Sequence, residues 1–295
     1  MSPLNALLQA VSLTSSALSS TFNNKTAKTC IHNQSDNLYY LFISRLAIVA
    51  VMFLYARTFR ISGTTLFLAV LFGLDSILCG VLSILSLKNG PMSLTILISQ
   101  GGALLISTIL GTILFHETVK PIQIVGIAIM LCVIILLSGA KASGNIKPIW
   151  FLTVTLGAAL CGMLGIIQKY QGASGLPEEK PVFLLYSFLV STAFNGIWLL
   201  VRTRTGKKEA VTVPVTAFFY RAAVITGIAG AVNNIINLKL AIEVPSAVFF
   251  PINAGGDIIL ASLISSLYFR EKLSAKQKVS FVLGFIAIFL IADVF

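Results

Sequence analysis

Residues 91–139 and residues 245–293 carry the same pattern of residues, offset by a constant 154 positions without a gap. The matches fall on Pro, Gly, Glu and Gln, which a shared hydrophobic composition would not align. They are Pro91 with Pro245, Gly101-Gly102 with Gly255-Gly256, Phe115 and Glu117 with Phe269 and Glu271, Gln123 with Gln277, and Val125 with Val279. Upstream, Gly73 matches Gly227 in the same register. The chain therefore contains an internal duplication, which inside a membrane is typical of transporters.

The composition places this duplication in a membrane. The chain is 57% hydrophobic and 11% charged, with a mean hydropathy of +0.94. A soluble domain of this length would expose large apolar patches. We therefore expect an integral protein of a cell membrane, in particular the bacterial cytoplasmic membrane, with membrane lipids as its surroundings.

Apolar runs of about 20 residues are long enough to cross roughly 30 Å of hydrocarbon. They occur at 4–22, 38–56, 65–87, 91–114, 121–140, 148–168, 181–201, 215–238, 246–269 and 277–294. The sequence thus predicts an all-α integral membrane fold with ten transmembrane helices. Because each half holds five spans, an odd number, the two five-helix repeats, 1–144 and 145–295, must be inverted relative to each other.

The formal charge of +11 does not indicate nucleic acid as a partner, because the Lys and Arg residues lie between the spans. If the loops alternate sides, the face richer in Lys and Arg is cytoplasmic, and both termini then lie outside. Cys30, Cys79, Cys132 and Cys161 have no metal-binding spacing, so we interpret them as small core residues and expect no metal and no cofactor.

The repeated element P-x9-GG-x12-F-x-E-x5-Q-x-V resembles the EamA-type branch of the drug/metabolite transporter superfamily, and the resemblance covers essentially the whole chain. It implies two inverted five-helix repeats, and a central cavity that opens to alternate sides. Family marks fall on Glu117 and Glu271 after the fourth helix of each repeat, on Arg45, and on Lys25 and Lys169. Phe188-Leu189-Val190 departs from the pattern, since no Arg counterpart occurs there. The family keeps both termini in the cytoplasm, so the orientation stays open.

Three charged residues lie deep within predicted spans: Arg45, Asp75 and Asp257. A charge at mid-bilayer costs at least about 2.5–3.5 kcal/mol, so each is a candidate substrate-binding residue. Asp257 lies near the midplane, and Asn253 precedes it by four residues on the same helix face. Asp75, whose repeat counterpart is Ala229, either exchanges a proton as the coupling ion or belongs to a buried pair in which Arg45 meets Asp75 or Asp257.

The remaining candidates are uncharged or lie at the membrane edge. Gln100 and Asn233 offer amides that suit a polar neutral or zwitterionic solute, or that hydrogen-bond neighbouring helices. The glycines, which permit either close helix packing or a break in a helix, are Gly101, Gly102, Gly255 and Gly256. We expect Glu117 and Glu271 to end helices and order loops near helix N-termini.

These features predict a secondary transporter that moves a small organic metabolite by alternating access, as a monomer or homodimer. An amino acid fits the candidates if Asp257 meets the ammonium group and Arg45 the carboxylate. The chain contains no GxxxxGK[ST], HExxH or GxSxG motif, so we do not expect an enzyme. The alternatives are an exporter of drugs or lipid-like cargo, or a membrane scaffold that transports nothing.

Overall fold

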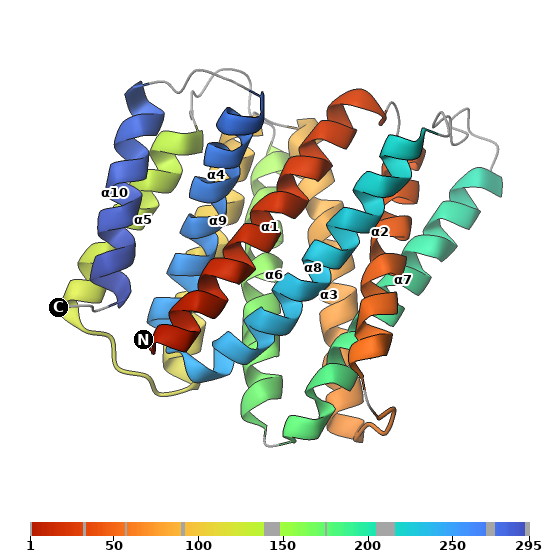
Figure 1. Cartoon of the computed structure of the whole chain (residues 1–295), viewed down its shortest axis with the longest axis horizontal. Helices are drawn as coiled ribbons and strands as arrows, with labels where there is room; N and C mark the ends of the chain where they lie inside the picture. The colour runs from red at the N-terminus through yellow and green to blue at the C-terminus, as the bar shows by residue number, and fades with distance from the viewer. Residues whose placement is uncertain are drawn as a thin grey trace.

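The computed structural model describes residues 2–31, 34–56, 58–89, 92–138, 148–174, 176–204, 216–269 and 275–292. Within these ranges the chain is all-α, with ten α-helices and one short 3-10 helix (Figure 1). In order they are α1 (Pro3–Thr29), α2 (Gln34–Tyr55), α3 (Gly63–Asn89), α4 (Met92–Leu114), α5 (Pro121–Ser138), α6 (Pro148–Ala173), η1 (Pro177–Glu179), α7 (Lys180–Arg204), α8 (Ala217–Glu243), α9 (Ser246–Phe269) and α10 (Ala275–Ala292). The predicted all-α class is confirmed.

The helices differ from the predicted spans mainly at the N-terminal end of the chain. The sequence predicts a loop over Asn23 to Asn37, but α1 continues to Thr29 and α2 begins at Gln34. Residues 23–29 are polar except for Ala27 and contain no Gly or Pro, so they hold no strong helix breaker. Polarity alone therefore set the predicted end of the first helix about two turns too early.

Five of the described helices are long and apolar enough to cross a membrane, namely α2, α3, α6, α7 and α8. Four shorter apolar stretches lie in α4, α5, α9 and α10. The helix α1 is in neither group because it is rich in Ser, Thr and Asn.

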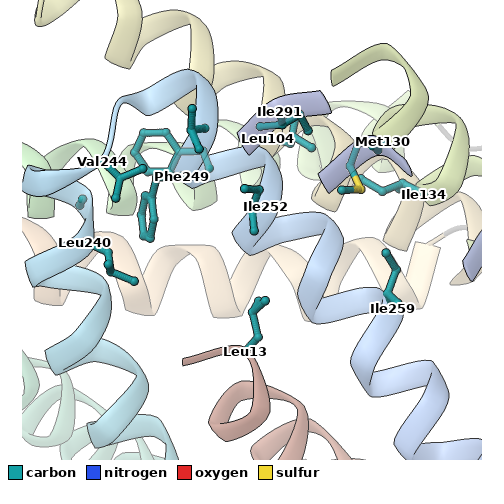
Figure 2. Close-up of a cluster of buried hydrophobic side chains, with 14 of the residues drawn as sticks. Leu13, Leu104, Met130, Ile134, Leu240, Val244, Phe249, Ile252, Ile259 and Ile291 are labelled. Carbon is teal, nitrogen blue, oxygen red and sulfur yellow. The ribbon is translucent and has the colours of Figure 1, made fainter. Parts of the chain in front are cut away.

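The helices follow one another as packed pairs along the long axis of the molecule. The pair α5 and α10 lies at one end and the pair α2 and α7 at the other (Figure 1). Between them, α1 packs on α8 and α9, while α6 packs on α3 and α4. A hydrophobic core joins α1, α4, α5, α6, α8, α9 and α10, and Leu13, Met130, Phe249 and Ile252 belong to it (Figure 2).

Two glycines that correspond in the duplication allow close helix contacts. A Cβ atom on Gly73 would lie 2.8 Å from the backbone oxygen of Ser187 on α7. A Cβ atom on Gly227 would overlap the backbone oxygen of Ser44 on α2. The same glycine of each half thus lets one helix touch the backbone of another.

The start of α3 is fixed by a side chain from outside the helix. The hydroxyl of Ser62 accepts from the Thr65 N–H at 3.3 Å, as an N-cap does. Glu179 in η1 accepts from the Ser62 N–H at 2.8 Å and from the Ser62 hydroxyl at 2.7 Å. Hydrogen bonds from Thr65 and then Ser62 hold the pKa of Glu179 below its ordinary value.

We expect Gly227→Ala and Gly73→Ala each to destabilise the protein by about 1–3 kcal/mol, because the new methyl group must displace a neighbouring backbone. The matched control is Gly80→Ala on α3, where a Cβ atom meets nothing within 4 Å. Unfolding of the purified variants in detergent measures the difference. If all three variants are equally stable, the close contacts do not limit the packing.

A second prediction concerns pH. The pKa of Glu179 is lowered in the folded state, so its ionised carboxylate stabilises the fold. This stabilisation is complete above the ordinary pKa of a glutamate, about 4.3. It is lost as the pH falls through the lower, folded-state pKa. Wild type should therefore lose more thermal stability on acidification than Glu179→Gln does. Parallel melting curves of the two proteins at every pH would contradict this.

Candidate polar cavity

A cavity of about 270 Å³ lies between α3, α4, α6, α8 and α9. Its apolar wall includes Phe72, Phe249 and Phe250. The polar side chains on its wall are Gln100, Ser107, Gln168, Asn234, Asn237, Asn253 and Asp257. None of the described lining residues is Lys, Arg or His. The wall therefore offers amide donors and acceptors, and one carboxylate.

Three of the residues predicted as substrate-binding line this cavity. Gln100 comes from α4, and Asn253 and Asp257 come from successive turns of α9. We did not predict Gln168, Asn234 and Asn237 as substrate-binding residues from the sequence. Asn234 and Asn237 belong to an Asn-rich run of α8, and Gln168 precedes the notable Lys169, so a search for buried amides would have found them.

Pro251 and the glycines of α9 and α4 shape the helices beside the cavity. Pro251 has no N–H, so the carbonyl of Ala247 lacks its intrahelical partner just before Asn253. A Cβ atom on Gly255 would overlap Met130 of α5, and one on Gly256 would lie 2.7 Å from Leu13 of α1. Gly102 likewise faces Ala158 of α6. These glycines serve close helix packing. Gly101 is less crowded, with its nearest neighbour at 3.7 Å.

Hydrogen bonds between helices hold part of the amide wall in place. Gln9 of α1 donates to the Asn253 oxygen at 3.2 Å. Gln168 of α6 donates to the Asn234 oxygen at 3.1 Å. These bonds orient three lining amides, those of Gln168, Asn234 and Asn253, and each of these amides keeps further donor or acceptor capacity for a ligand.

Asp257 is the acidic residue of the wall. The Ser16 side chain of α1 is its nearest described polar influence. Its Oδ1 atom is buried and has no hydrogen-bond partner among the described residues. An unmatched buried carboxylate oxygen is unfavourable unless a ligand or a proton compensates it.

The other predicted residues lie elsewhere. Arg45 donates to the backbone oxygen of Ser191 at 3.2 Å and to the Ser191 hydroxyl. With the Asn195 amide turned so that its oxygen faces the guanidinium, Asn195 accepts from Nη1 at 2.9 Å. Arg45 thus joins α2 to α7 and is not a lining residue. In the described structure it pairs with neither Asp75 nor Asp257, so the buried ion pair of the sequence analysis does not form.

Asn233 and Asp75 also lie outside the lining. Asn233 donates to the Ser12 hydroxyl at 2.9 Å, and Ser12 donates to Asn237 at 2.6 Å. This bonding joins α1 to α8. Both oxygens of Asp75 are buried without a hydrogen-bond partner within the described ranges. Glu271 lies outside the described residues.

Glu117 is positioned by the end of α4. His116 adopts φ 52°, and the Glu117 N–H bonds the Thr112 oxygen at 3.0 Å while the His116 N–H bonds the Ile113 oxygen at 3.4 Å. This is the Schellman pattern of helix termination. With the helix ended in this way, the Glu117 carboxylate reaches Ser246 and accepts a hydrogen bond from its backbone N–H at 2.6 Å. The sequence analysis placed Glu117 just before the next helix of the chain, but the helix whose first N–H it accepts is α9 and not α5.

Lys169 of α6 forms an ion pair with Glu117. It also donates to the Ser246 hydroxyl at 2.8 Å. The Lys169 side chain is only 5% exposed and that of Glu117 19%. We call Glu117, Lys169 and Ser246 the buried ion-pair cluster. It joins the end of α4, the last turns of α6 and the start of α9.

The buried ion-pair cluster lies beside one end of the cavity. Lys169 follows the lining residue Gln168, and Ser246 is one turn before the lining residues Phe249 and Phe250. Packing is close here as well, since a Cβ atom on Gly165 of α6 would overlap Phe250. The contact between α6 and α9 at this end of the cavity is therefore closely packed.

A disulfide joins Cys79 of α3 to Cys161 of α6, with Cα atoms 6.0 Å apart. Cys161 is a lining residue. The sequence analysis treated both as unpaired core residues, because their separation of 82 positions carries no spacing signal. The pairing follows from the packing of α3 on α6.

Neither a protein-family model nor a curated protein matches the sequence. One solved structure, described only as a crystal structure of a protein, is similar to this chain with a TM-score of 0.75. The similarity covers 97% of this chain and 96% of that one at 15% sequence identity. At this identity the likeness shows the fold alone.

We predict that the buried ion-pair cluster contributes strongly to the free energy of unfolding. Glu117→Gln should destabilise the protein by about 3–5 kcal/mol, because Lys169 is left buried without its counter-charge. The matched control is Glu243→Gln in the exposed Lys239–Glu243 pair, where about 1 kcal/mol or less is expected. The double variant Glu117→Leu/Lys169→Met should recover most of the loss. Unfolding in detergent measures all four proteins, and equal effects of the two Glu→Gln changes would contradict the prediction.

Proposed function

We propose that this protein is a membrane-embedded secondary transporter that moves a small polar organic solute by alternating access. The observation that carries the proposal is the cavity between five helices that is lined by amides and by Asp257. A polar, ligand-sized cavity has no role in a membrane scaffold. Concave sites with a few converging polar groups are the usual form of small-molecule sites.

The outer surface supports a membrane location. Large apolar side chains are exposed on the described helices, among them Leu54, Phe67, Ile113, Phe151 and Val282. They come from α2, α3, α4, α6 and α10. Apolar surface spread over so many elements is unfavourable in water and favourable in lipid.

The helix packing supports two inverted repeats, 1–144 and 145–295. Each helix of the first half corresponds to the helix five places later in the second half, so α1 corresponds to α6. In agreement with this, α1 packs on α8 and α9, and α6 packs on their counterparts α3 and α4. The same correspondence relates α2·α8 to α7·α3 and leaves α2·α7, α4·α9 and α5·α10 unchanged. The cavity then lies between the halves, with α3 and α4 from the first and α6, α8 and α9 from the second.

The cavity also bears on what is carried. Its volume of about 270 Å³ is just below the range of roughly 300–1,000 Å³ typical of sites for drug-sized ligands. This favours a small metabolite over bulky drugs or lipid-like cargo. An amino acid bound by both Asp257 and Arg45 receives no support, because Arg45 is engaged by Ser191 and Asn195 outside the cavity.

Alternating access needs contacts that form and break at the two ends of the site. The buried ion-pair cluster is suited to closing one end, because it joins α4, α6 and α9 beside Phe249 and Phe250. In the open state these three helix ends would separate while the core between α5 and α10 stays packed.

Transport is tested in liposomes containing the purified protein, offered a defined mixture of amino acids, amines, nucleosides and sugars. We expect wild type to accumulate members of one chemical class, and Asp257→Asn to take them up at least about tenfold more slowly, since a lost charged hydrogen bond is worth about 1.5–3 kcal/mol. Glu243→Gln, which removes an exposed acid outside the cavity, should transport normally. Uptake no greater than in protein-free liposomes for every class would overturn the proposal.

A further inference from the structure

The described lining of the cavity carries one acidic residue and no basic one. Asp257 is the described acid on the wall, and its Oδ1 has no hydrogen-bond partner in the described part of the chain. Two buried cations of the described helices are engaged elsewhere, since Lys169 pairs with Glu117 and Arg45 bonds Ser191. The protein itself therefore supplies no positive charge to this carboxylate among the residues described.

The rest of the polar wall is neutral. Gln100, Gln168, Asn234, Asn237 and Asn253 bring amides, which donate and accept hydrogen bonds without charge. Such groups bind hydroxyl or amide groups of a ligand well. They do not neutralise a carboxylate or phosphate, whose negative charge would also be repelled by Asp257.

We propose that the cavity selects a small solute with one protonated amine and no carboxylate or phosphate. Its ammonium group binds Asp257, and its hydroxyl or amide groups bind the surrounding amides. The proposal deepens the proposed function, on which it rests, by naming the charge class of the solute. It departs from the amino acid expected from the sequence, because the wall holds a partner for the ammonium group and none for the carboxylate.

A four-member probe series separates the two charges. For threonine, glutamine and leucine, the probes are the amino-acid amide, the amino acid, the N-acetyl amide and the N-acetyl amino acid. They carry, respectively, an ammonium alone, an ammonium with a carboxylate, no charge, and a carboxylate alone. Binding is measured by calorimetry and by thermal shift on the full chain in detergent, since a bound ligand raises the stability of the folded state.

We expect the amino-acid amides to bind at least about tenfold more tightly than the N-acetyl amides, which corresponds to about 1.4 kcal/mol or more for the ammonium contact. The amino acids should bind more weakly than their amides, and the N-acetyl amino acids should show no binding. In Asp257→Asn the advantage of the ammonium group should disappear. In the control Glu243→Gln, which removes the same charge from an exposed site, the advantage should remain.

Equal binding of the amides and the neutral N-acetyl amides to wild type would overturn the proposal, because Asp257 would then be neutralised by a proton. This comparison needs no variant, so it stands even if Asp257→Asn does not fold. Tighter binding of the amino acids than of their amides would overturn it as well. If uncharged or anionic solutes bind and are taken up by liposomes, the transporter proposal survives and the charge class fails. If the amines bind but are not taken up, the charge class survives and transport fails.

Discussion

The arrangement of the helix ends depends on how one buried positive charge is neutralised. Lys169 lies among apolar helices, where an unpaired ammonium group would cost several kcal/mol. Glu117 supplies the counter-charge, and Ser246 adds a hydroxyl acceptor for Lys169 and an N–H donor for Glu117. Because these three residues come from α4, α6 and α9, neutralising the charge also fixes the relative positions of three cavity walls. Separating Glu117 from Lys169 without solvating either charge is costly. The three helices are therefore expected to be either fully joined or fully apart at this point.

The polar character of the cavity depends on which buried polar groups are hydrogen-bonded and which are not. Close contacts at Gly255 and Gly256 bring α5 and α1 against one side of α9, and the side carrying Asn253 and Asp257 faces the cavity. Buried amides on α1, α6 and α8 satisfy one another in part, as between Gln168 and Asn234. The Oδ1 atom of Asp257 remains without a hydrogen-bond partner among the described residues. A wall that is mostly matched, with one unmatched charge, is able to discriminate between solutes by their charge.

The sequence predicted the all-α class, the approximate helix positions and three lining residues, because apolar periodicity and buried polarity are local signals. It did not predict that Arg45 lies outside the cavity, since depth along α2 does not reveal which neighbour its side chain faces. The disulfide between Cys79 and Cys161 was missed for the same reason, as it depends on packing between α3 and α6. Glu117 was expected near a helix N-terminus, but that this helix is α9 follows only from the fold.

The central claim is that one cavity is reached from each side of a membrane in turn. Ala103 lines the cavity on α4 and is small enough to be replaced by cysteine, in a chain whose unpaired Cys30 and Cys132 are changed to alanine. A membrane-impermeant thiol reagent is then applied to vesicles of either orientation, with Ile109→Cys on the apolar exterior as the control. The account predicts that Ala103→Cys reacts from both sides, that a bound solute slows the reaction, and that Ile109→Cys stays unreactive. Reaction from one side only, with and without solute, would contradict it.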